Sequence, residues 1–345
     1  MGLSIRDIIP RKEISIDSLK GKTIIVDGFN ALYQFLSTIR QIDGTPLMDS
    51  KENITSHLSG VFYRNVNLLC EGVKLIYVFD GDAPALKAKT HKKRKDIRDL
   101  AGEKYEQAKS EGDVESMKRY SSQLLRLDEK MIEESKELLK AMGIPVVQAP
   151  SEGEAEASFL CRKKNLFAVV SQDYDSLLFG APRLIQNLTI SRKKKTFSGY
   201  TEVLPVEIEL DLVLNELGIN LDQLICLGIL VGTDYNPKGV PGIGQKKALE
   251  IVKRFEQPYL IFKEVEEKVL SLSEEDRFDW REIFELFHSH DVEDVEIEFP
   301  KIDEDKIREI LVQRHDFSED RIERQLEKLR VLKEKKKQKG LGEWF

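Results

Sequence analysis

Cysteine is scarce in this sequence, with three residues among 345. Cys70, Cys161 and Cys226 lie far apart in apolar surroundings, and none has a second cysteine at the spacing of a metal site. We therefore expect all three to be buried, reduced thiols and no metal site to be built on them.

Long apolar runs are also missing, and none approaches the ~20 residues that a bilayer-spanning helix needs. Residues 1–6 carry neither a secretory apolar region nor the Ser or Thr that a myristoylation signal has at position 6. These absences predict a soluble, intracellular protein.

Charged residues are plentiful, at 33% of the chain against 41% hydrophobic residues. This composition is typical of a globular protein with a highly charged surface, and the length allows one large domain or two. The formal net charge of -7 by itself disfavours a nucleic-acid partner. Binding to nucleic acid depends, however, on where Lys and Arg gather rather than on the net charge.

Strand-like and helical patterns alternate in the first 80 residues. The segments 23–27 and 75–80 are apolar and strand-like, and residues 54–70 between them have a helical pattern. This alternation is typical of βαβ units. We therefore predict an α/β fold, with a mostly parallel central sheet and helices on both faces.

Carboxylates stand at the end of both strand-like segments. They also stand at or just after the end of two further apolar stretches that we expect to be strands, 167–175 and 225–231. Open parallel sheets bind ligands at the carboxyl ends of their strands, so these side chains are expected to converge. The converging residues are Asp27, Asp80, Glu152, Glu154, Asp173, Asp175 and Asp234. Two bare carboxylates about 4 Å apart repel by roughly 4 kcal/mol at an effective dielectric near 20. Such a cluster therefore needs divalent cations or protons.

Each acidic residue also fits a plain structural role. A single Asp after a strand is often a turn residue, and Ser151 followed by Glu154 fits a helix capping box. On an ideal helix Glu152 and Glu154 diverge, so both reach one cation only beyond the amino end of the helix. Asp173 and Asp175 share one side if the chain is extended there. The recurrence of the pattern, rather than any single residue, favours the shared site.

Residues 85–142 are charged, helical in pattern and almost free of proline. The densest basic run begins seven residues after the second strand-like segment, and it places Lys87 and Arg94 on one helical face toward the carboxylates. A solvated helix face is the alternative. Gly102 and Gly112 are expected to break the helices. An insertion of this length between sheet elements predicts an arch or lid.

A glycine-rich turn followed by a lysine-bearing helix occupies residues 234–256. Backbone N–H groups of such a turn and the helix amino end hold a phosphate without reading a base. The residues concerned are Gly242, Gly244, Lys246 and Lys247. The pattern predicts a helix-hairpin-helix-like DNA-binding element, with an ordinary glycine connection as the alternative. A second basic run, 192–195, is expected on a hairpin.

The tail, residues 333–345, starts as a basic run that we expect to be disordered or frayed. It ends in two large aromatic residues, Trp344 and Phe345. In one turn of tight helix Leu341 and Trp344 share a face beside Phe345, which favours insertion into a partner's pocket.

The order and spacing of the acidic motifs, the Gly-Ile-Gly turn and the tail resemble the flap endonuclease family of structure-specific 5′ nucleases. The resemblance covers residues 1–345 and is closest to archaeal members, because the tail lacks the longer basic extension of eukaryotic ones. It implies the cytoplasm or nucleoid for an archaeal protein and the nucleus for a eukaryotic one. The implied regions are an N-terminal nuclease region 1–98, a helical arch 99–145 that begins near 85, an internal nuclease region 146–256 with the hairpin 234–256, a C-terminal helical region 257–332 packed on the core, and a flexible tail 333–345 with a clamp-binding box.

The resemblance implies a centre of two Mg²⁺ ions, for which Mn²⁺ substitutes. The residues implied for one ion are Asp27, Asp80, Glu152 and Glu154. Those implied for the other, with some sharing, are Asp173, Asp175 and Asp234. Lys87 and Arg94 match a basic pair that polarises the scissile phosphodiester. Two hard cations on oxygen ligands suit an in-line displacement, so the chain supplies no nucleophile of its own.

The resemblance also implies contacts with DNA. Tyr33 matches a position that stacks on an unpaired base, with half-buried helix packing as the alternative. The full set of matching positions is Tyr33, Arg40, Arg64, Thr55, Glu152, Gly232, Asp234, Gly242, Gly244, Lys246 and Lys247. Residues 55–58 resemble the part that accepts a one-nucleotide 3′ flap, and His57 is expected to be structural or exposed. A monovalent cation is a further expectation at the hairpin, although Pro237 and Lys238 depart from the family pattern.

The expected activity is cleavage of a 5′ flap near the junction of single strand and duplex, with 5′-3′ exonuclease activity, in repair and in replication including Okazaki fragment maturation. The expected partners of the monomer are branched DNA and the sliding clamp PCNA. The clamp-binding residues are Gln338, Leu341, Trp344 and Phe345. One rival is a 5′ exonuclease or RNase-H-like nuclease of the same fold. The other is a non-catalytic DNA-bound clamp adaptor, which would gain nothing from the carboxylate repulsion.

Overall fold

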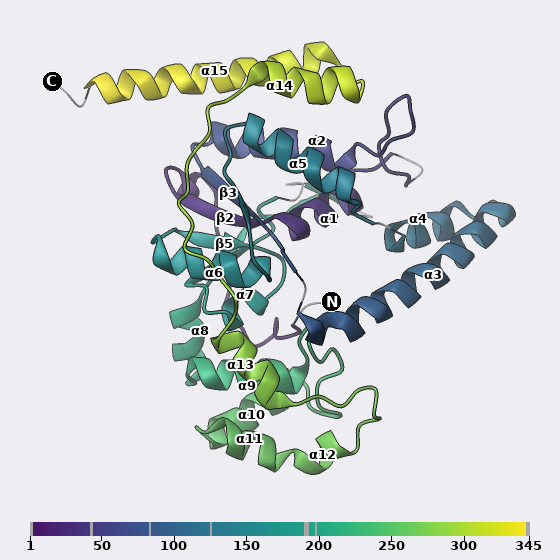
Figure 1. Cartoon of the computed structure of the whole chain (residues 1–345), viewed down its shortest axis with the longest axis vertical. Helices are drawn as coiled ribbons and strands as arrows, with labels where there is room; N and C mark the ends of the chain where they lie inside the picture. The colour runs from purple at the N-terminus through teal and green to yellow at the C-terminus, as the bar shows by residue number, and fades with distance from the viewer. Residues whose placement is uncertain are drawn as a thin grey trace.

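A seven-stranded sheet forms the centre of the molecule, in the order β1-β9-β6-β5-β2-β3-β4 (Figure 1). The computed structural model describes residues 3–41, 44–82, 84–124, 126–189, 193–196 and 199–342. Within these ranges the side chains at 85, 88–89, 91–95, 114, 118, 122–123, 193–196, 199–202 and 332–342 lie outside the description. The strands of the sheet are β1 (Lys12–Glu13), β2 (Thr23–Asp27), β3 (Lys74–Phe79), β4 (Val146–Gln148), β5 (Ala168–Val170), β6 (Arg183–Gln186) and β9 (Val206–Glu209).

The sheet is mostly parallel, as predicted. β2 pairs in parallel with β3 and β5, and the parallel set continues to β4 on one side and β6 on the other. β9 is antiparallel to β6 and β1. Because Val26 stands opposite both Tyr77 and Val170, the carboxyl ends of the three central strands meet at one edge. A separate hairpin pairs β7 (Lys193–Thr196) with β8 (Gly199–Glu202), as expected for the second basic run.

Helices cover both faces of the sheet, which confirms the predicted α/β fold. Ile24 and Val26 of β2 face a core shared with α1 (Gly28–Thr38), α2 (Ser56–Cys70) and α5 (Glu129–Ala141). Ile25 points the other way, into a core shared with α6 (Gly153–Lys163). The alternation follows from the two-residue period of an extended chain.

The C-terminal half packs on this body in two places. α14 (Glu304–Arg308), the π-helical turn Glu309–Arg314 and α15 (Glu319–Gly342) lie over α2 and α5, where Ile307, Leu311 and Leu326 are buried (Figure 1). A second core gathers the shorter helices. These are α7 (Asp175–Leu178), α8 (Leu210–Leu217), α9 (Leu221–Val231), α10 (Gln245–Arg254), α11 (Pro258–Glu264), α12 (Glu266–Leu270) and α13 (Trp280–His288).

Two helices project from the body, α3 (Ala88–Glu111) and α4 (Val114–Gln123), and they pack against each other (Figure 1). The projecting pair is narrower than the region predicted as an arch, because α5 belongs to the core. Gly112, with φ of 70°, ends α3 as predicted. Gly102 does not break α3, which continues through it, so that expectation was wrong.

The apolar stretch 225–231 is part of a helix rather than a strand. It lies in α9, which starts at a capping box between Asn220 and Gln223 and is buried on nearly all sides. A short apolar run does not distinguish a buried strand from a buried helix, which explains the error.

The backbone of α15 is helical as far as Gly342, so most of the basic run expected to be disordered or frayed is helical. Trp344 and Phe345 lie outside the described residues. Cys161 and Cys226 are buried free thiols, and Cys70 is a half-buried one. In the described chain, no single helix is long and apolar enough to cross a bilayer, and the bent pair α8 and α9 reaches that threshold only by joint length and composition.

Candidate active site

A cavity of about 450 Å³ opens at the carboxyl edge of the parallel strands. Its lining residues are Asp27, Phe29, Asn30, Tyr33, Asp80, Gly81, Lys87, Ser151, Glu152, Glu154, Asp173 and Asp234. Six of the seven predicted carboxylates thus share one cavity. The seventh, Asp175, is buried next to them, close enough for its charge to raise the pKa of Glu154. The structure therefore brings together all seven acidic residues that the sequence grouped.

Asp27 and Asp80 are placed by the ends of two neighbouring strands and by helix amino ends. Asp27 caps α1, with Oδ1 accepting a hydrogen bond from the Asn30 N–H at 3.0 Å. Asp80 follows β3, and its Oδ1 accepts from the Gly153 N–H at 2.6 Å, at the first residue of α6. A Cβ on Gly153 would stand 2.5 Å from that oxygen, so only glycine permits this contact. Both carboxylates also benefit from the positive end of a helix dipole.

Glu152 and Glu154 flank the start of α6. Glu152 occupies its N-cap position without a side-chain cap, and Ser151 Oγ instead donates to the Asp82 carbonyl at 3.0 Å. The predicted capping box is therefore wrong. Both glutamates nevertheless line the cavity, which lies beyond the amino end of α6, where the helix geometry predicted that they could meet.

Asp173 and Asp175 do not lie on a strand, so the expectation of extended chain was wrong. β5 ends at Val170, and Asp175 is already the first residue of α7. Asp173 Oδ2 accepts from the Asn30 amide at 3.1 Å. Oδ1 of Asp175 is buried and has no hydrogen-bond partner among the described residues.

The cluster carries a strong excess of negative charge. Burial, together with the charge of Asp80, raises the pKa of Asp27 to about 7. Burial and the charge of Asp234 raise the pKa of Asp175 to about 7 as well. The pKa of Glu154 is raised well above its ordinary value, by burial and then by Asp175 and Asp27. The site therefore favours bound cations or protons over bare carboxylates.

Lys87 supplies a compensating positive charge. Its ammonium forms an ion pair with Glu152 and lies 3.9 Å from Asp234 Oδ2. Burial alone would lower the pKa of Lys87, but the charge of Glu152 more than offsets this and raises it. Arg94 lies two turns further along α3, and its side chain is outside the described part.

The expected DNA contacts fall into two groups. Tyr33 is 40% exposed at the cavity, and Lys246 and Lys247 are exposed at the start of α10. Gly242, with φ of 70°, and Gly244, the N-cap of α10, form the turn before them.

The residues of the second group form hydrogen bonds within the protein, are wholly or partly buried, or pack against its backbone. Arg40 donates to the Gly44 carbonyl at 2.6 Å and to Ser121 Oγ at 2.9 Å, so it ties α4 to the body. Thr55 is buried, at 4% exposure. Gly232, with φ of 115°, faces the backbone of Gly239, which a Cβ would meet at 3.0 Å. Arg64 is half-buried in α2.

His57 is buried, as one of its two expected alternatives required. Burial lowers its pKa to about 4, so it is neutral at neutral pH. Both ring nitrogens lack a hydrogen-bond partner among the described residues. His57 is therefore a core residue and does not face the carboxylate cavity.

Several residues around the carboxylates were not predicted. Asn30 connects Asp27 to Asp173. Ser171 Oγ lies 3.1 Å from Glu154 Oε1 and 3.3 Å from Asp27 Oδ2. The spacing of Asn30 from Asp27 fits an N-cap and could have identified it. The contacts of Ser171 depend on chain crossings that the sequence does not reveal.

Comparison with known proteins identifies the family. The XPG N-terminal domain matches residues 4–101, and the XPG I-region matches residues 143–234. Flap endonuclease 1 of Staphylothermus marinus is 48% identical over the whole of both chains. The chain belongs to the flap endonuclease 1 family. The resemblance and the flap endonuclease function expected from the sequence are confirmed.

Two further flap endonucleases and one more distant solved structure also resemble this chain. Flap endonuclease 1 of Pyrococcus furiosus is 48% identical across 100% of this chain and 99% of that protein. The solved flap endonuclease-1 from Methanococcus jannaschii is 41% identical, covers 97% of this chain and 100% of its own, and superposes with a TM-score of 0.75. The catalytic core of Rad2, solved in complex with a DNA substrate, is 22% identical with a TM-score of 0.68, covers 96% of this chain and 100% of its own, and shares the fold.

Proposed function

We propose that this flap endonuclease family member hydrolyses a DNA phosphodiester near the junction of a 5′ single strand and a duplex, at the carboxylate cavity. The observation that carries the proposal is the convergence of seven acidic side chains and Lys87 from five separate parts of the chain. Such crowding costs stability, and burial together with the neighbouring carboxylates raises the pKa of Asp27 and of Asp175. Catalysis is the function that best accounts for that cost.

The donor set fits two Mg²⁺ ions, with Mn²⁺ as a substitute. All the proposed ligand atoms are carboxylate oxygens, which hard divalent cations prefer. Asp175 Oδ1 is buried, and no described residue donates a hydrogen bond to it. In the described part of the chain, no three His, Cys, Asp or Glu side chains lie close enough together to hold a metal ion. When bound, two such ions activate a water and offset charge on the transferred phosphate.

Groups of the protein itself hold the carboxylates in place and orient the scissile phosphate. The N–H of Gly153 fixes Asp80, and the Asn30 side chain fixes Asp173. Lys87 would exchange Glu152 for an oxygen of the scissile phosphate, and Arg94 would act beside it from the same helix. Such preorganised charges lower the barrier because they need not reorganise during the reaction.

DNA would be held through its backbone. The turn at Gly242 and Gly244, with the exposed Lys246 and Lys247, presents N–H groups and charge suited to duplex phosphates. Tyr33 would stack on an unpaired base at the cavity mouth. Arg40 and Arg64 belong to the same proposed surface. In replication and repair, the clamp PCNA would bind the tail through Gln338, Leu341, Trp344 and Phe345.

A labelled double-flap duplex tests the proposal. With Mg²⁺ we expect a single cut near the junction, no cut in EDTA, and slower cleavage of a blunt duplex or an RNA strand. Asp175→Asn should lower the single-turnover rate by at least about 100-fold while the Kd for the flap substrate changes little. Asp211→Asn, an exposed carboxylate on α8, is the matched control and should leave the rate unchanged. Parental activity in Asp175→Asn would refute the assignment.

A further inference from the structure

The base of α3 is attached at two points to the loop that carries Asp234. Lys87 contacts the Asp234 carboxylate, and its ammonium also lies 5.4 Å from the ring centroid of Tyr235. Three residues later, Thr90 Oγ1 donates a hydrogen bond to the Asp234 carbonyl at 2.6 Å. Thr90 is buried, at 6% exposure. Residues three apart share a helix face, so both side chains reach Asp234.

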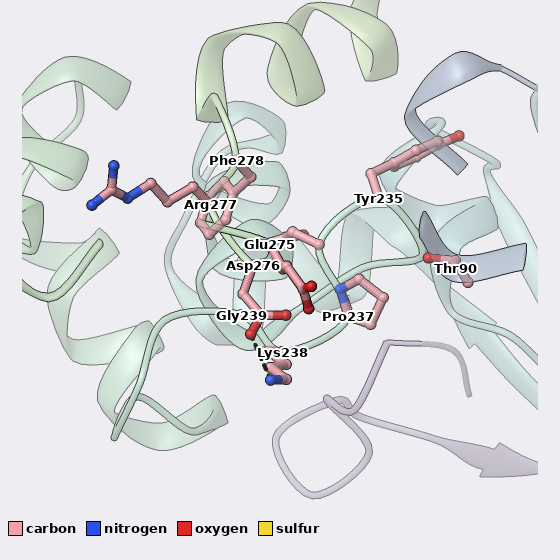
Figure 2. Close-up of a pocket in the computed structure, with 10 residues that line it drawn as sticks. Thr90, Tyr235, Pro237, Lys238, Gly239, Glu275, Asp276, Arg277 and Phe278 are labelled. Carbon is pink, nitrogen blue, oxygen red and sulfur yellow. Dashed lines mark hydrogen bonds and ion pairs between the residues drawn. The ribbon is translucent and has the colours of Figure 1, made fainter. Parts of the chain in front are cut away.

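The loop is a firm anchor for these contacts. The Asn236 side chain accepts from the Thr233 N–H at 3.1 Å and donates to the Ile229 carbonyl at 2.7 Å. Lys238 forms an ion pair with Asp276 at 2.6 Å, shown by the dashed line in Figure 2. Figure 2 also shows that Thr90 and Tyr235 line the same pocket as these residues. The loop that carries this carbonyl is therefore fixed by contacts on both sides of Asp234.

The contacts of Lys87 and Thr90 differ in whether they must break during catalysis. The ammonium of Lys87 is paired with Glu152, and it must leave that carboxylate to reach a phosphate oxygen. Leu86 adds only a non-directional apolar contact with the second core. Thr90 donates to a backbone carbonyl, and this bond can persist while Lys87 changes partner.

We propose that Thr90 is a positioning residue, whose hydroxyl holds the first turn of α3 against Asp234 while Lys87 moves from Glu152 to the scissile phosphate. The inference rests on the proposed function and specifies how Lys87 is placed. No signal in the sequence identified Thr90, because the bond joins residues 144 positions apart.

Thr90→Val removes the donor but keeps the branched shape of the side chain, and Thr90→Ala is a second variant without the donor. Losing one directional hydrogen bond should lower the single-turnover rate on a labelled 5′ flap with Mg²⁺ by about 5- to 20-fold. The Kd for the same DNA in EDTA should change by less than about twofold, because substrate binding does not use this bond. Thr90→Ser, which restores the donor, should recover most of the rate.

A double-mutant cycle with Lys87→Ala separates positioning from general stability. If Thr90 acts through Lys87, Thr90→Val should slow Lys87→Ala by less than about twofold, since the group to be positioned is already absent. Additive losses would overturn the inference, and so would a parental rate in both Thr90→Val and Thr90→Ala. Thermal unfolding of each variant identifies any that fails to fold, and Thr90→Ser then decides. If the parent chain itself cuts no flap, the proposed function fails instead.

Discussion

At the scale of single residues, the site depends on contacts so close that a larger side chain would disrupt them. Asp80 lies at the amino end of α6 only because Gly153 has no side chain. The sequence identified Asp80 from its place after a strand, since the end of a strand can be read from local composition. It did not reveal Gly153, Asn30 or Ser171 as partners, because those contacts join distant parts of the chain.

Gly153→Ala should displace the Asp80 carboxylate and lower the cleavage rate by about 10- to 100-fold, the range expected for a misplacement of about 1 Å. Gly102→Ala is the matched control, because a Cβ there meets only Leu124, at 3.6 Å. It should leave the rate unchanged and stabilise α3 by about 0.5–1 kcal/mol. Single-turnover rates and thermal unfolding measure both effects. Equal rates for the two variants would contradict the placement of Asp80.

At the scale of elements, the sequence identified the strands and long helices better than their ends. β2, β3 and α2 occur where the apolar periodicity placed them. α9 was misread because its burial on all sides removes the periodicity of a surface helix. The short β5 ended earlier than expected, and a turn and α7, rather than strand alternation, place Asp173 and Asp175.

The hairpin and α10 give an element-scale prediction. Replacing Lys246 and Lys247 together by Ala should weaken flap binding and reduce the slope of log K against log salt by about 2, one for each lost phosphate contact. Lys301→Ala, an exposed lysine ahead of α14, should leave the slope unchanged. Binding titrations at several salt concentrations provide the measurement. An unaltered slope in the double variant would exclude α10 from the DNA surface.

The tail gives a second prediction at this scale. Deleting residues 338–345 should leave cleavage of a flap substrate at its parental rate, because the cavity lies on other elements. It should abolish stimulation by PCNA and binding to it. Surface binding assays and cleavage with added clamp measure these effects. Persistent stimulation of the truncated chain would show that the clamp binds elsewhere.

At the scale of the whole molecule, the cavity forms where the sheet edge meets the second core. Asp27 and Asp80 come from the sheet, whereas Asp234 follows α9 of the second core. The parallel sheet could be predicted from alternating patterns. The packing of α14 and α15 on α2 and α5 could not, because nothing local in residues 304–342 indicates which surface they cover.

The charge of the cavity links its stability to pH. Asp27 and Asp175 have folded-state pKa values near 7, raised from 3.8. Their contribution to the free energy of unfolding is therefore fully present below about pH 4 and is lost as pH rises through 7. His57 has the opposite effect, because its pKa is lowered from 6.5 to about 4. Its contribution to the free energy of unfolding is present above about pH 6.5 and is lost as pH falls toward 4. Only the carboxylates should respond to Mg²⁺. Mg²⁺ should therefore raise the Tm more at pH 8 than at pH 5.5, and an equal rise at both would contradict this linkage.

The most direct test of the shared carboxylate site is a count of bound Mn²⁺ by electron paramagnetic resonance, with the chain in complex with an uncleavable flap DNA. We expect about two ions per complex for the parent, as a two-metal site requires. We expect the loss of at least one ion in an Asp80→Asn and Asp175→Asn double variant that still binds the DNA. Two tightly bound ions in that variant would contradict a shared carboxylate site.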